Sequence, residues 1–142
     1  MPYKFSDTSK EKLLTCHKDL QLICNHVIKI IDVVVIEGKR DLKKQQEYFR
    51  DGHSKLDGVI KKSKHQVSEE NPFSMAVDIA PYPLDWKDLS RFYFLAGIFK
   101  GVAFELQQQG LIKHSVRWGG DWDSDNSFKD QSFNDLPHFE LK

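Results

Sequence analysis

The sequence predicts an α+β fold in which a small antiparallel sheet is flanked by helices. Apolar residues recur at helical spacing near the N-terminus and again between residues 86 and 109. Four short runs, residues 32–37, 75–80, 116–118 and 136–141, are β-branched or alternate in polarity, as strands do. No internal repeat, low-complexity tract or linker divides the 142 residues, so we predict a single domain covering residues 1–142.

The first helix is predicted from about Ser9 to Ile30. Thr8 at the N-cap and Glu11 three residues later have the spacing of a capping box, and the apolar positions that follow recur along one face. Cys16 and Cys24 fall on this one helix, where their separation of about 12 Å is too large for a disulfide. We therefore expect two reduced thiols, at least half-buried, that bind no metal.

The elements that follow alternate between sheet and helix. The β-branched run Asp32–Glu37 predicts a buried strand, which Gly38 ends. Asp41 can cap a second helix that runs from Leu42 to about Arg50. The polar, lysine-rich stretch 51–73 indicates a loop.

The second half of the chain predicts one strand before a long helix and two strands after it. Met75–Ala80 alternates in polarity and is followed by two prolines, which end a strand. Asp85 can cap a helix from about Trp86 to Gln109, whose apolar positions form one stripe. Val116–Trp118 is expected to be a short strand, and Leu136–Leu141 is expected to be the final, edge strand of the sheet.

Composition excludes several classes of function. The chain has 21 basic and 21 acidic residues and no net charge, so it lacks the positive field of a dedicated nucleic-acid binder. No apolar run approaches the roughly 20 residues of a membrane span. Residues Met1–Asp7 show no charged region followed by an apolar one, so we expect no secretory signal peptide and synthesis in the cytoplasm.

Two short segments, far apart in the sequence, carry the residues of a metal site. His65, Asp78 and His138 are two imidazoles and one carboxylate, the ligand set of a catalytic zinc that keeps a fourth position open. Asp135, three residues before the second histidine, is placed to serve as the base that activates water. The other histidines, His17, His26, His53 and His114, lack such a context and are expected to be surface or packing residues.

Four sequence motifs, in a fixed order along the chain, indicate which known proteins this site resembles. The motifs are Glu37-Gly38-Lys39-Arg40 with Gln45, Ser63-Lys64-His65 with Ala76-Val77-Asp78, Arg117-Trp118-Gly119-Gly120-Asp121-Trp122, and Asp135-x-x-His138-Phe139-Glu140. In these motifs the chain resembles the zinc D,D-peptidases, whose domain is hedgehog/DD-peptidase-like and which include the L-alanyl-D-glutamate endopeptidases of phage endolysins. The resemblance extends from about Val33 to the C-terminus.

The resemblance implies a role for each matched residue. His65, Asp78 and His138 are expected to bind one zinc ion, and Asp135 is expected to be the catalytic acid and base. Arg40 is expected to hold a substrate carbonyl or carboxylate and to stabilise the developing oxyanion. Ser63 and Gln45 are substrate-contact candidates. Glu140 either orients a ligand histidine as a second carboxylate or is a surface charge on the edge strand.

The chain departs from the family pattern at one place. Thirteen positions separate His65 from Asp78, through an insertion at about residues 68–73, and the usual glycine is missing. A surface loop absorbs such an insertion at small entropic cost, so the ligand set can survive it. The alternative is an inactive relative that has lost its site.

The polar segment 121–134 is predicted to be a loop with a possible second metal. Asp121, Asp123 and Asp125 alternate along it, and oxygen ligands at such spacing can bind calcium. A solvated acidic loop is the competing interpretation, because no later glycine and glutamate complete an EF-hand. Trp118 and Trp122 flank the two glycines and are expected either to wall the cleft or to pack in the core.

The function predicted from the resemblance is zinc-dependent cleavage of peptidoglycan. The substrate is expected to be the L-Ala-D-Glu bond of stem peptides, and the protein a phage endolysin, made in the host cytoplasm and released to the periplasm by a holin. A monomer is expected. Two alternatives stay open: a D,D-carboxypeptidase or D-Ala-D-Ala dipeptidase, and a non-catalytic, zinc-stabilised peptidoglycan-binding module.

Overall fold

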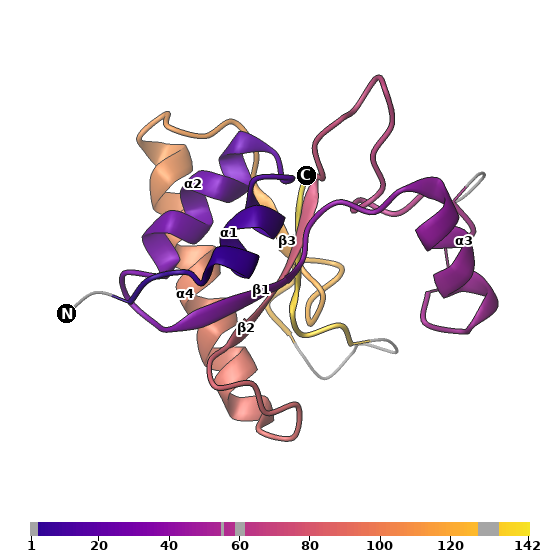
Figure 1. Cartoon of the computed structure of the whole chain (residues 1–142). Helices are drawn as coiled ribbons and strands as arrows, with labels where there is room; N and C mark the ends of the chain where they lie inside the picture. Colours follow the sequence, from indigo (N-terminus) through magenta and orange to yellow (C-terminus); the bar gives the residue numbers. More distant parts are fainter. Residues whose placement is uncertain (1–2, 55, 59–61, 128–133) are drawn as a thin grey trace.

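A computed structural model describes residues 3–54, 56–58, 62–127 and 134–142 of the chain (Figure 1). Within these ranges it contains four helices and four strands that form a single antiparallel sheet, so the predicted α+β class is confirmed. In chain order they are α1 (Asp7–Leu13), α2 (Lys18–Val27), β1 (Val33–Glu37), α3 (Leu42–Arg50), β2 (Ala76–Pro81), α4 (Leu89–Gln108), β3 (Val116–Trp118) and β4 (His138–Leu141).

The N-terminal helix is two helices, which corrects the prediction of one continuous helix. Ser6, and not Thr8, caps α1, because its side chain accepts from the Ser9 amide. The chain then leaves helical geometry because Thr15 and His17 exchange backbone hydrogen bonds with Ser74, from a distant loop. Apolar periodicity runs through this break, which is why the sequence pattern concealed it.

The two cysteines accordingly lie on different elements. Cys16 occupies the break between α1 and α2, and Cys24 belongs to α2. Both are free and fully buried, as predicted, although the helix on which that prediction was based does not exist as one element. Burial raises the pKa of the Cys16 thiol to about 12 and that of Cys24 well above its ordinary range.

The strand order β1-β2-β4-β3 makes β4 an interior strand, not the predicted edge strand. β4 pairs with β2 on one side and with β3 on the other. In this register Asp78 stands directly opposite His138, and Glu140 stands directly opposite Arg117. Because side chains alternate between the faces of a sheet, all four polar residues share one face.

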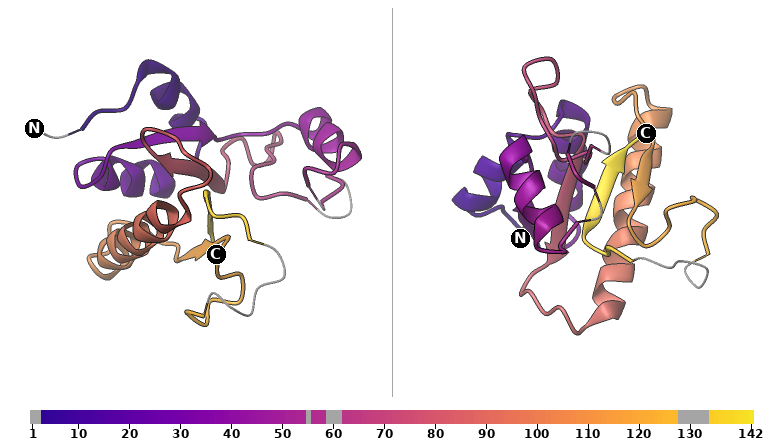
Figure 2. Two further views of the ribbon diagram at one scale, coloured as in Figure 1. Left: turned by 90° about the horizontal axis from the view of Figure 1, so that it is seen from below. Right: turned by 90° about the vertical axis from the view of Figure 1, so that its right-hand side faces the viewer.

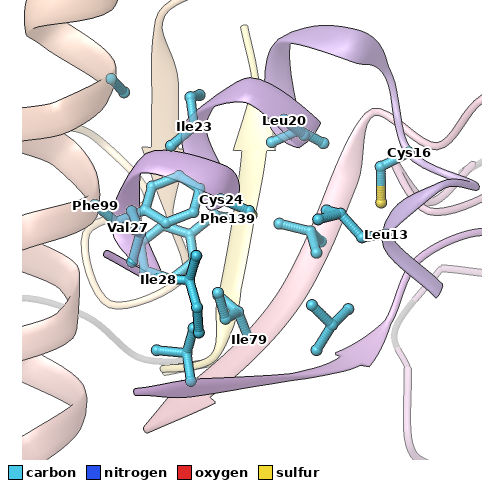
Figure 3. Packing of buried hydrophobic residues seen from close by; sticks show 14 of the residues in the cluster. Leu13, Cys16, Leu20, Ile23, Cys24, Val27, Ile28, Ile79, Phe99 and Phe139 are labelled. Atoms are coloured by element: carbon cyan, nitrogen blue, oxygen red, sulfur yellow. The ribbon is translucent and has the colours of Figure 1, made fainter. Parts of the chain in front are cut away.

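The opposite face of the sheet carries the hydrophobic core. α4 packs there against β2 and β3, and α2 packs against α4, so that their apolar side chains form one cluster with Ile79 and Phe139 (Figure 3). Phe99 of α4 stacks on Phe139, with 4.0 Å between ring centroids. Trp118 is also buried in this cluster, so it packs in the core and does not wall a cleft. Burial of this apolar face is the main force that holds the sheet in place.

The remaining elements frame the polar face. α3 begins after Asp41, whose side chain accepts from the Lys44 amide, and its bounds match the prediction. It stands apart from the rest of the molecule in two views (Figures 1 and 2). α4 begins at Leu89, three residues later than expected, after the N-cap Asp88. None of the helices in the described ranges has the length and apolar character needed to cross a bilayer.

Candidate metal centre

Two histidines and an aspartate from three segments converge on one point. His65 Nε2 lies 3.0 Å from Asp78 Oδ1 and 3.2 Å from His138 Nδ1, and the remaining edge, between His138 Nδ1 and Asp78 Oδ1, is 3.2 Å. Ligands placed about 2.0 Å from a tetrahedral zinc are about 3.3 Å from one another. The three atoms therefore form a triangle of the size that a zinc ion requires.

The outer nitrogens of both imidazoles are held by hydrogen bonds that decide their tautomers. His65 Nδ1 donates to the Gly38 carbonyl at 2.8 Å, and His138 Nε2 donates to Glu140 Oε1 at 2.8 Å. Each neutral ring therefore turns an unprotonated nitrogen toward the Asp78 carboxylate. Two lone pairs and a negative charge facing one another fit a divalent cation, and outer acceptors of this kind orient histidines at metal sites.

The charges of the cluster depend on burial and on each other. Burial alone would raise the pKa of Asp78, but His65 and His138 outweigh it and hold that pKa far below its usual range. Burial alone would lower the pKa of His138, but hydrogen bonds with Asp78 and Glu140 raise it to about 9. Both shifts show that positive charge is favoured at this point, carried by a proton on His138 or by a metal ion that takes the place of that proton.

Asp135 lies beside the cluster and is not part of the triangle. Its Oδ2 is 3.9 Å from His138 Nδ1, and its side chain is 35 % exposed. Burial and the neighbouring Asp78 carboxylate raise the pKa of Asp135 above its ordinary value. A raised pKa makes this carboxylate a better proton acceptor.

Gly119 holds the Asp135 backbone in this position. The Asp135 amide donates to the Gly119 carbonyl at 2.9 Å, and the Gly119 amide donates to the His138 carbonyl at 2.8 Å. A Cβ at position 119 would lie 2.9 Å from the carbonyl carbon of Asp135 and still closer to its oxygen. Only glycine permits this close approach.

Arg40 is fixed by the residues that the sequence analysis associated with it. Its Nε and Nη2 groups donate to Glu37, and Nη1 donates to Gln45 Oε1 at 2.6 Å and to Ser63 Oγ at 3.4 Å. Its guanidinium lies over the Tyr48 ring, 4.5 Å from the centroid. Arg40 borders a cavity next to the metal cluster, together with Ser63.

Gln45 does not fit the substrate contact predicted for it. Its side chain is fully buried, and its amide nitrogen donates to Ser54 Oγ and to the Leu56 carbonyl. Its amide oxygen accepts from Arg40 Nη1. Gln45 therefore positions Arg40 and does not reach a ligand.

The insertion between His65 and Asp78 leaves the cluster intact. The Met75 amide donates to the Lys64 carbonyl at 2.9 Å, so the loop closes at its base directly beside His65. Residues 68–73 are exposed and project away from the sheet (Figure 1). The loop therefore absorbs the extra residues without displacing either ligand.

Glu140 and Trp122 complete the surroundings. Glu140 is 4 % exposed and bridges His138 and Arg117, which rules out the surface-charge alternative. Glu140 was predicted on an edge strand, and its burial follows from the interior position of β4. The Trp122 ring lies against the His138 ring, with 5.3 Å between centroids, and borders the same cavity.

A second cluster of two histidines and an aspartate was missed by the sequence analysis. Asp19 is buried, and its Oδ2 accepts from His114 Nδ1 at 2.8 Å and from the amides of Lys113 and His114. His17 caps α2 by accepting from the Asp19 amide. Burial would raise the pKa of Asp19, but these hydrogen bonds outweigh it and lower the pKa from 3.8. Hydrogen bonds account for the cluster, which ties the start of α2 to the segment before β3.

The acidic loop brings its three aspartates together. One oxygen from each of Asp121, Asp123 and Asp125 lies within 4.8 Å of the others. Asp121 is buried, and its oxygens accept from the Asp125 and Asn126 amides. Lys100 Nζ lies 3.7 Å from the same carboxylate. Residues 128–133 of the predicted loop 121–134 lie outside the described residues.

Comparisons with known proteins identify the family. The statistical model of the phage L-alanyl-D-glutamate peptidase family matches residues 1–142. The chain is 31% identical over 116 residues to the peptidoglycan L-alanyl-D-glutamate endopeptidase CwlK of Bacillus subtilis (strain 168), covering 80% of this chain and 62% of that protein. Its fold is similar to that of the Serratia marcescens L-Ala D-Glu endopeptidase ChiX, with a TM-score of 0.71 at 24% identity over 98% of this chain and 90% of that one. The chain thus belongs to the phage L-alanyl-D-glutamate peptidase family.

Proposed function

We propose that this protein is a zinc-dependent endopeptidase that cleaves the L-Ala-D-Glu bond of peptidoglycan stem peptides. The observation that carries the proposal is the triangle of His65, Asp78 and His138, with a carboxylate of raised pKa beside it. Family membership supports the choice of substrate, since the family is described by this bond.

His65, Asp78 and His138 hold the metal in this proposal, and Glu140 holds His138 in the right tautomer. Zinc bound there supplies a Lewis acid that activates water and polarises a carbonyl. Asp135 accepts a proton from the attacking water at its carboxylate and later delivers it to the leaving amine. Its pKa is raised by burial and by the neighbouring Asp78 carboxylate, which makes Asp135 a stronger proton acceptor than an ordinary carboxylate.

Arg40 supplies positive charge to the reacting carbonyl. Four of its five N–H groups are bonded to Glu37, Gln45 and Ser63, which fixes the plane of the guanidinium. Among the described residues, one N–H on Nη2 has no hydrogen-bond partner, and in this proposal it donates to a substrate oxygen. A donor that is held rigidly before the reaction stabilises a developing oxyanion without the cost of reorganisation.

The decisive experiment identifies the new ends produced from peptidoglycan. The zinc-loaded protein is incubated with purified sacculi, and the products are analysed by mass spectrometry. Free D-Glu amino ends support the proposed endopeptidase. Released D-Ala would instead support the D,D-carboxypeptidase or dipeptidase, and zinc binding with no new ends would leave only a binding module.

The role of Asp135 has its own test. Asp135→Ala is expected to abolish turnover and to leave one zinc bound, because Asp135 is not one of the three converging ligands. The matched control is Asp51→Ala at an exposed position after α3, which is expected to be fully active. Loss of zinc from Asp135→Ala, or activity that persists, would contradict the assignment.

The biological setting that we propose is phage lysis. The enzyme is made in the host cytoplasm and reaches the wall after holin-type permeabilisation. Expression in a Gram-negative host with and without a holin tests this, and lysis that does not depend on the holin contradicts it. A single-domain monomer stays a prediction, which limited proteolysis and light scattering can check.

Calcium at Asp121, Asp123 and Asp125 also stays a prediction. Its support is the convergence of three carboxylates, which are hard oxygen ligands. Calorimetric titration with calcium checks it, using Asp123→Asn as the weakened variant. Heat of binding that is unchanged in this variant, or absent from the wild type, favours the solvated acidic loop.

A further inference from the structure

The metal cluster lies between two cavities of opposite character. One, of about 400 Å³, has a basic lining and is called here the basic cavity. The other, of about 370 Å³, is called the apolar cavity. The basic cavity includes Arg40, Lys62, Lys64, Arg117 and Trp122, and the apolar cavity includes Trp86, Leu89, Phe92, Leu136 and Pro137.

The proposed catalytic groups lie where the two cavities meet. Asp135 borders both cavities, Asp78 borders the apolar one, and His65 and His138 border the basic one. A peptide whose scissile carbonyl lies at this cluster can therefore place the residue before the bond in one cavity and the residue after it in the other. The lining of each cavity decides which residue goes where.

Charge separates the two cavities clearly. Four cationic side chains border the basic cavity, against the two carboxylates of Asp135 and Glu140. The described lining of the apolar cavity contains no cationic side chain. A carboxylate on the substrate is therefore attracted to the basic cavity, and an uncharged segment is better accommodated in the other.

Arg117 is the cation best placed to bind such a carboxylate. Its Nε and Nη2 groups donate to Glu140 Oε2 at 3.2 and 2.7 Å, which holds the guanidinium at the edge of the cavity. The guanidinium also lies over the Trp122 ring, 5.8 Å from its centroid. Its Nη1 group has no hydrogen-bond partner among the described residues, and its side chain is 36% exposed. Arg40, by contrast, is largely engaged with protein groups.

We propose that the basic cavity receives the leaving-group side of the substrate and that Arg117 binds the carboxylate next to the scissile nitrogen. In a stem peptide the D-Glu residue is linked onward through its γ-carboxyl, so its α-carboxylate is free and adjacent to that nitrogen. The L-Ala side carries a methyl group and no charge, and it lies in the apolar cavity against Trp86 and Leu89. This assignment rests on the proposed function and adds a specificity: the enzyme distinguishes D-Glu from its α-amide, D-isoglutamine.

The test compares two synthetic stem peptides that differ only at this carboxyl group, one with D-Glu and one with D-isoglutamine. The zinc-loaded wild type is expected to cleave the D-Glu peptide with kcat/KM at least about tenfold higher, since a charge-assisted hydrogen bond is lost with the amide. Arg117→Gln is expected to lose this preference by slowing only the D-Glu peptide, and Arg117→Lys is expected to keep part of it.

Two controls separate recognition from structural damage. Arg50→Gln makes the same change at an exposed position outside both cavities and is expected to leave both rates unchanged. Trp86→Ala, at a side chain that is 53% exposed, is expected to slow both peptides by a common factor. Zinc content is measured for every variant, because Arg117 contacts Glu140.

Three results would overturn the proposal. The first is a wild type that cleaves both peptides at equal rates, and the second is an Arg117→Gln variant that slows both equally. Either of these two results refutes the role proposed for Arg117, while cleavage between Ala and Glu still supports the proposed function. The third is no cleavage of that bond in either peptide by the zinc-loaded wild type, which refutes the proposed function and the specificity together.

Discussion

Replacing Gly119 by alanine tests whether the position of Asp135 controls catalysis. The new Cβ would lie 2.9 Å from the carbonyl carbon and 3.0 Å from the Cβ of Asp135, whereas ordinary contact begins at 3.4 Å. Because the carbonyl oxygen is nearer still, the Asp135 backbone must retreat by roughly 1 Å, and a misplacement of that size costs about 100-fold in rate. Gly119→Ala is therefore expected to lower kcat about 100-fold.

The assay measures kcat on a stem peptide, zinc content and thermal unfolding of the same preparations. Zinc is expected to stay at one ion per chain, because the hydrogen bond that joins Gly119 to His138 is made by the backbone carbonyl of His138 and not by its ring. Gly97→Ala is the matched control, since a Cβ there meets nothing within 4 Å and lies on an exposed part of α4. It is expected to keep full activity and to gain about 1 kcal/mol in stability. A folded Gly119→Ala protein with wild-type kcat would refute the reasoning.

Three further substitutions probe other parts of the structure. Glu140→Gln is expected to weaken zinc binding about tenfold, measured against a competing chelator, because the acceptor behind a ligand histidine loses its charge; unchanged affinity contradicts this. The pKa of Asp19 is lower in the folded chain than its ordinary 3.8, so its carboxylate stabilises the fold above that pH and ceases to do so as pH falls through the folded pKa. Asp19→Asn should therefore lower the free energy of unfolding by about 1–3 kcal/mol at neutral pH and by less as the pH falls below 3.8, measured by urea unfolding, while Asp51→Asn changes neither value. A loss that does not shrink below pH 3.8 contradicts the linkage. Ser9→Ala removes the buried acceptor of the Val35 amide and should cost about 1–3 kcal/mol, measured in the same way, and no loss would show that water replaces the hydroxyl.

Local signals predicted the elements that depend on local chemistry. α3 begins after its capping aspartate and ends at Arg50, as predicted, and β1, β2 and β3 lie within a residue or two of the predicted runs. The break after α1 and the interior position of β4 were missed for a common reason. Both depend on hydrogen bonds with segments far away in the sequence, Ser74 in the first case and β3 in the second, and periodicity contains no information on such partners.

The residues of the candidate site also divide into those that sequence motifs predicted and those that only the fold reveals. Motif order selected His65, Asp78 and His138, and the structure brings their ligand atoms within 3.2 Å of one another. The sequence did not predict that Gln45 is buried behind Arg40, since residue type alone does not indicate burial. Nor did it predict the Asp19 cluster, whose members come from two segments about 95 residues apart and join only through folding.

Because the insertion loop closes at its base, the length of the loop does not affect the positions of His65 and Asp78. The hydrogen bond between the Lys64 carbonyl and the Met75 amide fixes the spacing of the chain on either side, whatever lies between. Residues 68–73 are exposed, and their backbone takes no part in the sheet. This loop is therefore a natural grafting point. A short peptide that adheres to the bacterial surface could be built into it, which would tether the enzyme to its target without a separate module fused at either terminus.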